Sequence, residues 1–211
     1  MQGIPYSRRG LIAGLASTSV IGIMLPARAA DQPGVTEPIE QLVDALLQAM
    51  KAGPGTPFNK RFDLLAPVVD HTFDLPAILQ QSVGAPWENL PPDQQAMLVQ
   101  AFRRYTVASY VNSFNAFNGQ RFEVKPDTRA VGNEQVVQTR IIPPRGDAHK
   151  LDYVMRETGK GWKAVDVLAE GSISRVAVQR SDFRRLLSRG GAQALADSLR
   201  AKSTDLSDGL S

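Results

Sequence analysis

The 211-residue sequence contains no cysteine and only two histidines, His71 and His149. Without cysteine the protein can form no disulfide, no thiolate metal site and no cysteine nucleophile. Two histidines also argue against a zinc site built from several imidazoles. The sequence has neither a glycine-rich phosphate-binding loop nor an EF-hand calcium loop. From these absences we expect that the protein uses no metal and no cofactor.

The charge of the chain is small, although its pI of about 9.3 is basic. There are 24 basic and 21 acidic residues, a net charge of +3. Arg8, Arg9 and Arg28 lie in the first 29 residues, which contain no acidic residue. Without that segment, 21 basic residues are balanced by 21 acidic ones. The basic pI is therefore no evidence for nucleic-acid binding, and we expect no nucleic-acid partner.

The N-terminus has the features of a cleaved export signal. Arg8 and Arg9 precede an uncharged run at residues 11–25, and Ala27-Arg28-Ala29 is a small-x-small cleavage site. The run is shorter than the roughly 20 residues that span a bilayer, which disfavours a retained anchor. The Arg8-Arg9 pair with its neighbours also fits the twin-arginine export pattern, so the general and twin-arginine routes both stay open. We expect residues 1–29 to be removed and the mature protein to be periplasmic.

Hydrophobic spacing predicts a mainly helical part at residues 30–118. Apolar residues recur there at intervals of three and four, as they do on one face of a helix. Glycine and proline clusters interrupt this pattern and mark the ends of helices. We expect helices from Thr36 to about residue 52, at 57–73, from Asp74 to Gly84, and at 92–117.

The pattern changes to a period of two at residues 119–172, which predicts a sheet of four strands. Because short turns join them, we expect an antiparallel meander; parallel strands would need much longer crossovers. Residues 173–202 return to helical spacing, with a break at Gly190-Gly191, and residues 203–211 are predicted to be a flexible tail. Helices, a meander and further helices indicate an α+β fold. The predicted strands are 121–131, 134–143, 149–157 and 161–170.

Two irregularities stand out in these elements. In the helix at 92–117, Phe102 and Tyr105 lie on one face, whereas Tyr110 and Phe114 lie roughly 120° around the helix axis. The strands likewise carry apolar residues on both faces. Both patterns fit a solid core, and both also fit a cavity between two layers.

The last helix carries an excess of positive charge. Residues 140–202 contain 13 basic and 7 acidic residues, and four arginines recur at steps of four along one stretch of the helix. This stripe is either a solvated face or a docking site for an acidic protein or for phosphate headgroups. Its residues are Arg180, Arg184, Arg185 and Arg189.

The residues leave two other functions open. Asp166 and Glu170 lie four apart on a predicted strand and would share a face, and paired carboxylates can act as acid and base. With Tyr153 assisting, they could make the protein a periplasmic enzyme with an α+β pocket. The simpler interpretation of the pair is a capped strand end or ion pairs with neighbouring bases. The other alternative is an export adaptor that binds only proteins through its arginine-rich helix.

Motifs spread over residues 38–200 resemble those of the MlaC family, also called the toluene-tolerance family. The most specific stretch is Gly161-Trp162-Lys163-x-x-Asp166-Val167-x-x-Glu170-Gly171-Ser172-Ile173-Ser174, followed by Arg180-Ser181-Asp182-Phe183. His71-Thr72-Phe73-Asp74-Leu75, Gly84-x-x-Trp87 and Gln94 to Phe102 add to it. Where the family often has Asn-Tyr, this chain has Val178-Gln179, which looks like the branch associated with hopanoid-lipid gene clusters.

The resemblance implies a periplasmic lipid carrier and no catalysis. Its ligand would be a phospholipid or a hopanoid-type lipid, moved between the inner and outer membranes. Its partners would be an inner-membrane ABC transporter with an MCE-domain subunit and an outer-membrane lipoprotein complex. The implied fold is a cystatin/NTF2-like sheet packed with a helical subdomain, with acyl chains between sheet and helices.

Such a carrier needs a dry, apolar cavity. Burying an acyl chain is worth about 0.8 kcal/mol per CH₂, so a lipid with ~30 methylenes needs shielding worth on the order of 20 kcal/mol. The two irregularities described above supply the candidate lining. We expect the lipid to contact Phe102, Tyr105, Tyr110, Phe114, Val137, Ile141, Tyr153, Met155 and Val165.

Overall fold

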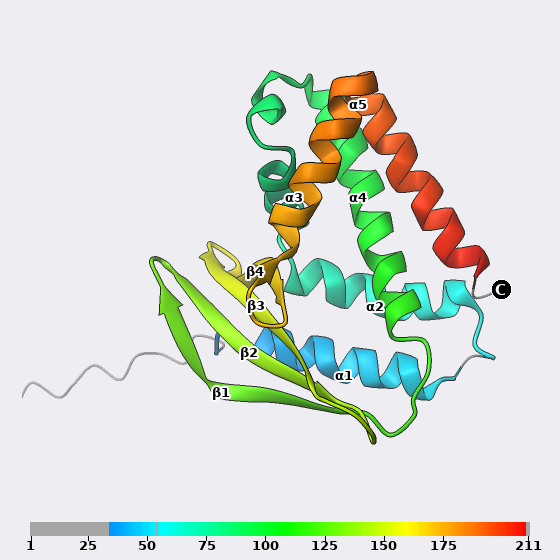
Figure 1. The fold of residues 1–211 in the computed structure, drawn as a ribbon, viewed down its shortest axis with the longest axis vertical. Helices are drawn as coiled ribbons and strands as arrows, with labels where there is room; N and C mark the ends of the chain where they lie inside the picture. Colours follow the sequence, from blue (N-terminus) through cyan, green and yellow to red (C-terminus); the bar gives the residue numbers. More distant parts are fainter. Residues whose placement is uncertain (1–33, 54, 210–211) are drawn as a thin grey trace, which may run out of the picture. The chain divides into compact units, whose positions relative to one another are not determined.

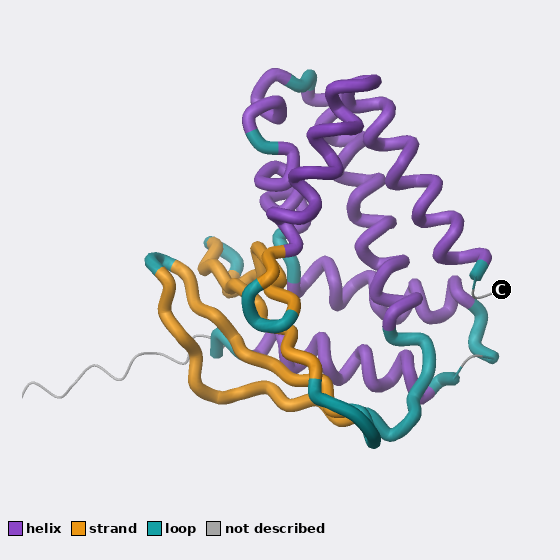
Figure 2. Tube along the Cα trace, viewed as in Figure 1, coloured by secondary structure: helices purple, strands orange, loops and turns teal. Residues whose placement is uncertain are grey.

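A computed structural model describes residues 34–53 and 55–209 (Figure 1). The predicted export signal lies outside the described residues. In the described part the strands gather on one side and the helices on the other (Figure 2). The helices are α1 (Glu37–Lys51), α2 (Phe58–Thr72), α3 (Leu75–Val83), the short 3₁₀ helix η1 (Ala85–Asn89), α4 (Pro92–Ser113) and α5 (Arg175–Asp208). The strands are β1 (Arg121–Val131), β2 (Glu134–Ile142), β3 (His149–Thr158), β4 (Gly161–Ala169) and β5 (Ile173–Ser174).

The strands form one antiparallel sheet in the order β1-β2-β3-β4-β5. The α+β class and the antiparallel meander are therefore confirmed, but the sheet has five strands and not four. The fifth, β5, has two residues, which is too short for a period of two to be recognised in the sequence. It pairs back onto β4 because the backbone reverses at Glu170 and Gly171, where φ is +52° and +74°.

Helix α3 shows how local sequence fixes an element next to the sheet. The Asp74 carboxylate caps the helix by accepting a hydrogen bond from the Ala77 amide at 3.1 Å. The Asp74 amide in turn donates to the Ala164 carbonyl of β4 at 3.0 Å. The connection between α2 and α3, which contains Phe73, is thereby held against the sheet.

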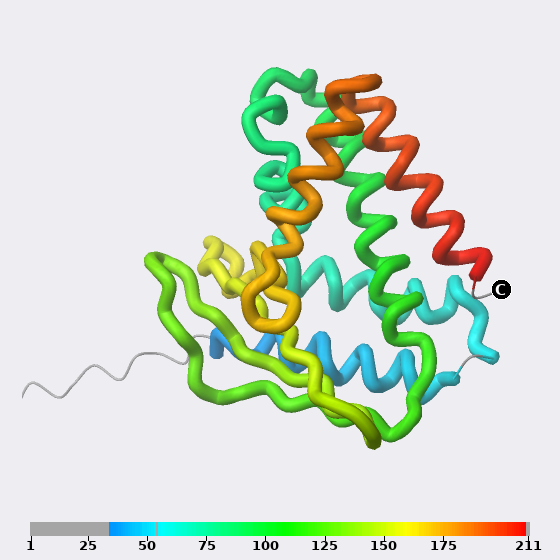
Figure 3. The backbone as a smooth tube through the Cα atoms, in the orientation of Figure 1, coloured from blue at the N-terminus to red at the C-terminus, as the bar shows by residue number. Residues whose placement is uncertain are grey.

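Helix α5 folds back on itself at two glycines. Gly191 has a φ of +65°, a conformation that favours glycine, and it divides α5 into an N-terminal limb (175–189) and a C-terminal limb (192–208). Both limbs pack beside α4, and the C-terminal limb returns along it (Figure 3). Phe183 of the N-terminal limb makes an edge-to-face contact with Phe102 of α4, with ring centroids 6.2 Å apart.

Two predicted boundaries are corrected by this packing. Helix α4 ends at Ser113 and not near residue 117, because the chain turns at Phe114 toward β1. The predicted flexible tail is helical as far as Asp208, because Ser203 is buried in the C-terminal limb and donates to the Leu199 carbonyl at 2.7 Å. Among the described helices, none is both long and apolar enough to cross a membrane.

Candidate functional site: an apolar cavity between helices and sheet

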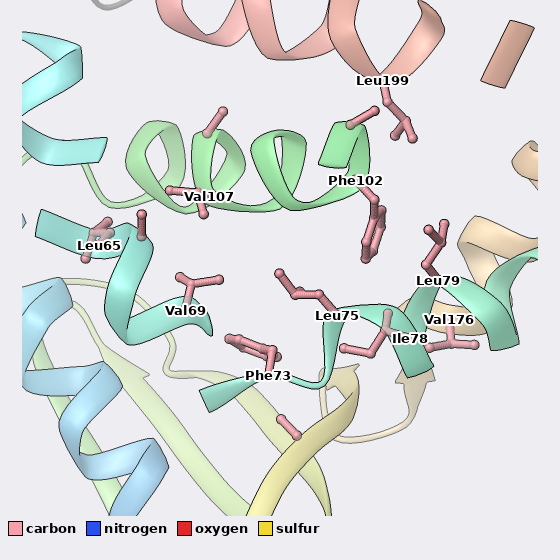
Figure 4. Close-up of a cluster of buried hydrophobic side chains, with 14 of the residues drawn as sticks. Leu65, Val69, Phe73, Leu75, Ile78, Leu79, Phe102, Val107, Val176 and Leu199 are labelled. Atoms are coloured by element: carbon pink, nitrogen blue, oxygen red, sulfur yellow. The ribbon is translucent and has the colours of Figure 1, made fainter. Parts of the chain in front are cut away.

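A cavity of about 370 Å³ lies among α3, α4, the N-terminal limb of α5 and the sheet. We call it the apolar cavity. Its inner wall is built from Phe73, Leu75 and Ile78, which come from the start of α3 and the residues before it, and from Phe102 of α4. Figure 4 shows Phe102 pointing from α4 toward α3, where Leu75 and Ile78 lie. The volume is within the range of about 300–1,000 Å³ that is usual for small-molecule sites.

A row of aromatic rings forms the floor of the apolar cavity; Phe73, Tyr110 and Phe114 line the space, and Tyr153 and Phe122 contact these rings without lining it. The ring of Phe73 lies 6.2 Å from that of Tyr153 on β3 and 5.5 Å from that of Tyr110 on α4. Tyr110 stacks on Phe114 with an interplanar angle of 15°, and Phe114 contacts Phe122 of β1 at 5.9 Å. This row explains why α4 ends where it does, since Phe114 leaves the helix to lie between Tyr110 and Phe122.

The phenol groups in this row are neutral over the ordinary pH range. Burial is the main cause that raises the pKa of Tyr110, and the neighbouring Tyr153 hydroxyl adds to it, while the charge of Arg175 opposes the shift. Burial also raises the pKa of Tyr153. Because both phenols keep their protons, they present hydroxyl groups to the interior rather than charges.

Two groups of polar side chains also line the apolar cavity. Hydroxyl groups come from α4, and Asp166 on β4 lies with Arg175 and Gln179 of α5 at the side where Arg175 is exposed, which we call the mouth. The hydroxyl residues are Thr106, Ser109 and Ser113. The Asp166 carboxylate accepts hydrogen bonds from the amides of Val167 and Val176, at 2.7 and 3.1 Å, and from the Ser174 hydroxyl. Asp166 therefore serves to fix the start of α5 against β4. The Gln179 amide oxygen accepts a hydrogen bond from the Ser82 hydroxyl at 3.2 Å.

The structure brings five of the nine predicted lining residues to the cavity wall and leaves four elsewhere. Val137, Tyr153 and Met155 are in the buried core beneath the helices, and Val165 is buried at a bulge of β4. Contact of any of the nine with a lipid stays a prediction. The five at the wall are Phe102, Tyr105, Tyr110, Phe114 and Ile141.

Sequence reasoning missed the contribution of the residues around α3 and at the start of α5. Phe73 and Leu75 belong to a motif that was used only for the family resemblance, and their apolar character was the available signal. Arg175 and Gln179 had no such signal, because their position at the mouth depends on how β5 turns the chain into α5.

The four arginines predicted for partner docking do not form one free surface. The Arg180 guanidinium donates two hydrogen bonds to the Gln81 carbonyl, at 3.0 and 2.8 Å, and so ties α5 to α3. Arg185 pairs with Asp182 at 3.0 Å. Arg184 and Arg189 are exposed. Docking through this helix stays a prediction.

The carboxylates that could have made an enzyme lie at different places. Asp166 is at the mouth of the apolar cavity, whereas Glu170 follows the end of β4, is exposed, and lies 3.4 Å from the His149 Nδ1 atom. Glu170 borders a separate polar hollow that does not include Asp166. The expectation that the two would share one face of a strand is wrong, because β4 ends at Ala169.

A second hollow, of about 630 Å³, lies on the other side of Phe73 and Leu75, which line both. We call it the charged hollow because Asp70, Arg103 and Lys163 border it. The Arg103 guanidinium makes two hydrogen bonds to the Asp70 carboxylate, at 2.8 and 2.6 Å, and these raise the pKa of Arg103. The Lys163 Nζ atom donates to the carbonyls of Asp70 and His71. Within residues 34–209, no cluster of three or more histidine, aspartate or glutamate side chains could hold a metal ion.

Comparison with known proteins identifies the family of this chain. The model of the family described as "MlaC protein" matches residues 40–201. The chain belongs to the MlaC family. A solved structure with the same fold is that of the phospholipid-binding protein from Ralstonia solanacearum in complex with a phospholipid. It is 22% identical in sequence and superposes with a TM-score of 0.71, over 82% of this chain and 98% of that chain. No curated protein sequence matches the chain.

Proposed function

We propose that this MlaC-family protein is a periplasmic carrier that holds a phospholipid by its acyl part in the apolar cavity. The observation that supports the proposal most is the cavity itself, which has an aromatic and aliphatic interior and polar groups at its mouth. The solved protein from Ralstonia solanacearum has the same fold and is described as phospholipid-binding. An amphiphile fits such a site with its chain inside and its headgroup outside.

The energy of binding would come mainly from removing methylene groups from water. Each CH₂ that is buried contributes about 0.8 kcal/mol, and the walls around Phe73, Phe102 and Phe114 offer no charge inside. The mouth opens beside α5, where solvent can reach the headgroup. A carrier built in this way keeps the chain dry without attaching it covalently.

We further propose that the protein moves its lipid between the inner and outer membranes. In this role it would be the substrate-binding component of an ABC-type transport system that has an MCE-domain subunit. An outer-membrane lipoprotein complex would be its other partner, and a hopanoid-type lipid would be an alternative cargo. These statements rest on membership of the MlaC family, whose proteins are periplasmic.

The first test is to purify the mature protein natively, extract it with organic solvent and identify lipids by mass spectrometry. Uptake of a labelled phospholipid from vesicles is measured in parallel. We expect one phospholipid class to co-purify and the labelled lipid to enter the protein. If no lipid co-purifies and none is taken up, the carrier proposal is overturned.

A pair of neighbouring isoleucines on β2 supplies a matched test of the site. Ile141 lines the apolar cavity, whereas Ile142 points to the opposite side of the strand and does not line it. Ile141→Glu places a carboxylate where the chain would lie, and because an unpaired buried charge is costly, uptake should fall at least about tenfold. Ile142→Glu is the control and should bind lipid as the wild type does. Equal uptake by both variants would remove the apolar cavity from the proposal.

A further inference from the structure

Arg175 is a cation at the rim of an otherwise apolar site. It is the first residue of α5, its side chain is exposed, and it lines the mouth of the apolar cavity. Tyr110 of the aromatic row lines the same cavity. The backbone at Arg175 is held because the Ser174 hydroxyl caps α5 by accepting from the Ala177 amide at 3.0 Å.

Among the described residues, no carboxylate forms an ion pair with this guanidinium. The carboxylate beside it in the cavity wall, Asp166, already accepts hydrogen bonds from two backbone amides and the Ser174 hydroxyl. In the part of the chain that the structure describes, arginines are paired with acids at four other places, and Arg175 belongs to none of these pairs. The Arg175 guanidinium therefore has its donor groups available at the cavity mouth.

Gln179 offers further donors one helical turn away. Its amide oxygen shares the single proton of the Ser82 hydroxyl with the Ile78 carbonyl, at 3.2 and 2.8 Å, and its NH₂ group can donate elsewhere. The start of α5 also carries a partial positive charge from the helix dipole, although Asp166 satisfies part of it. The mouth thus carries a cation and neutral donors, together with the Asp166 carboxylate, which is already hydrogen-bonded to two backbone amides and to Ser174.

We propose that Arg175 and Gln179 bind the phosphate of a lipid headgroup, so that the protein selects phosphate-bearing lipids over neutral lipids with the same chains. This inference rests on the proposed function, because it needs a lipid whose chain occupies the apolar cavity. A guanidinium matches the geometry of a phosphate and donates two parallel hydrogen bonds to it. A neutral lipid would leave those donors to water and gain nothing from them.

The test uses short-chain lipids in monomeric solution, so that attraction to a membrane surface does not contribute. Binding of dioctanoyl phosphatidylglycerol and of dioctanoylglycerol is measured for the wild type, Arg175→Gln and Arg184→Gln. Arg184 is an exposed arginine on the same helix that does not line the cavity, and it serves as the matched control. Thermal unfolding of each variant confirms that the fold is retained.

We expect Arg175→Gln to weaken binding of the phosphatidylglycerol roughly tenfold or more and to leave binding of the diacylglycerol unchanged. Arg184→Gln should change neither. An unchanged preference in Arg175→Gln, or an equal loss in Arg184→Gln, would overturn the inference while lipid binding itself stands. If the wild type binds neither lipid, the proposed function fails instead.

Glycerol 3-phosphate separates a headgroup site from a site for free phosphate. Because this molecule has the phosphate but no chain, it should neither saturate the protein at concentrations where the lipid does nor displace the lipid. If it binds as tightly as the lipid and loses that binding in Arg175→Gln, the mouth is a site for free phosphate esters and headgroup recognition is excluded.

Discussion

The two hollows on either side of Phe73 and Leu75 differ in volume and in the chemistry of their linings, and the larger hollow is the less suited to a lipid. The charged hollow is the larger, at about 630 Å³ against about 370 Å³, and it is lined by Asp70, Asp74, Arg103, Lys160 and Lys163. Asp70 and Arg103 bind each other, Lys163 binds backbone carbonyls and Asp74 caps α3. The apolar cavity is smaller and is lined mainly by aromatic and aliphatic side chains, and within the described part of the chain the Arg175 guanidinium at its mouth forms no ion pair. The chemistry of the lining side chains, and not the volume of the hollow, therefore indicates which hollow suits an amphiphile.

The largest effect is expected from the wall that the two hollows share. Phe73→Ala removes a ring that is 4% exposed and contacts both Tyr110 and Tyr153, so it should lower the free energy of unfolding by about 3–5 kcal/mol. Urea unfolding followed by circular dichroism measures the loss. Phe117→Ala, at a ring that is 40% exposed, is the control and should cost less than about 1 kcal/mol. Equal losses would show that Phe73 does not hold the wall together.

The second-largest effect is a loss of stability at alkaline pH, which we expect from the aromatic floor of the apolar cavity. The phenols of Tyr110 and Tyr153 have raised pKa values in the folded state, whereas unfolded tyrosine ionises near pH ~10. The stability that the two buried, protonated phenols contribute is complete below the pKa of unfolded tyrosine. It is lost as the pH rises above that pKa toward the higher pKa values of the folded protein. Above pH ~10 each phenol should therefore lower the free energy of unfolding by up to about 1.4 kcal/mol per pH unit.

Urea unfolding between pH 8 and pH 11 measures this decline. The double variant Tyr110→Phe with Tyr153→Phe should show a shallower decline than the wild type, because its floor no longer titrates. The same slope in both proteins would mean that the alkaline loss arises from other groups.

The smallest effect is expected in the charged hollow. The side chains of Asp70 and Arg103 are 40% and 41% exposed, so Asp70→Asn should lower the free energy of unfolding by no more than about 1 kcal/mol. Lipid uptake should be unchanged, because neither side chain lines the apolar cavity. If Asp70→Asn reduces uptake as strongly as Ile141→Glu, the two hollows act as one site and the comparison fails.

Most of the sheet could be predicted because apolar and polar residues alternate along each long strand and because a glycine lies in each turn between strands. The predicted strand 121–131 has the bounds of β1, and the other three predicted strands differ from β2, β3 and β4 by one residue at one end. The two-residue strand β5 has too few residues to alternate. The helical end of the chain was missed because Ser203 is buried by the returning limb of α5, which local sequence does not specify.

The candidate site was harder to predict, because the sequence of a strand does not show what covers each face of the sheet. A period of two shows that Tyr153 and Met155 share a face, but it does not show whether that face meets helices or a cavity. The helices cover these two residues, whereas Ile141, near the end of β2, reaches the cavity wall. Arg175 reaches the mouth only because β5 and the turn before it place the start of α5 there.

The wall between the two hollows is one side chain thick at Phe73 and Leu75, since both residues line both spaces. It therefore acts as a partition whose removal would join the two hollows into one passage. A chain entering beside α5 would then meet water at its far end, on the side of Asp70 and Arg103. In the proposed carrier, the bulk of these two side chains would limit how far an acyl chain extends.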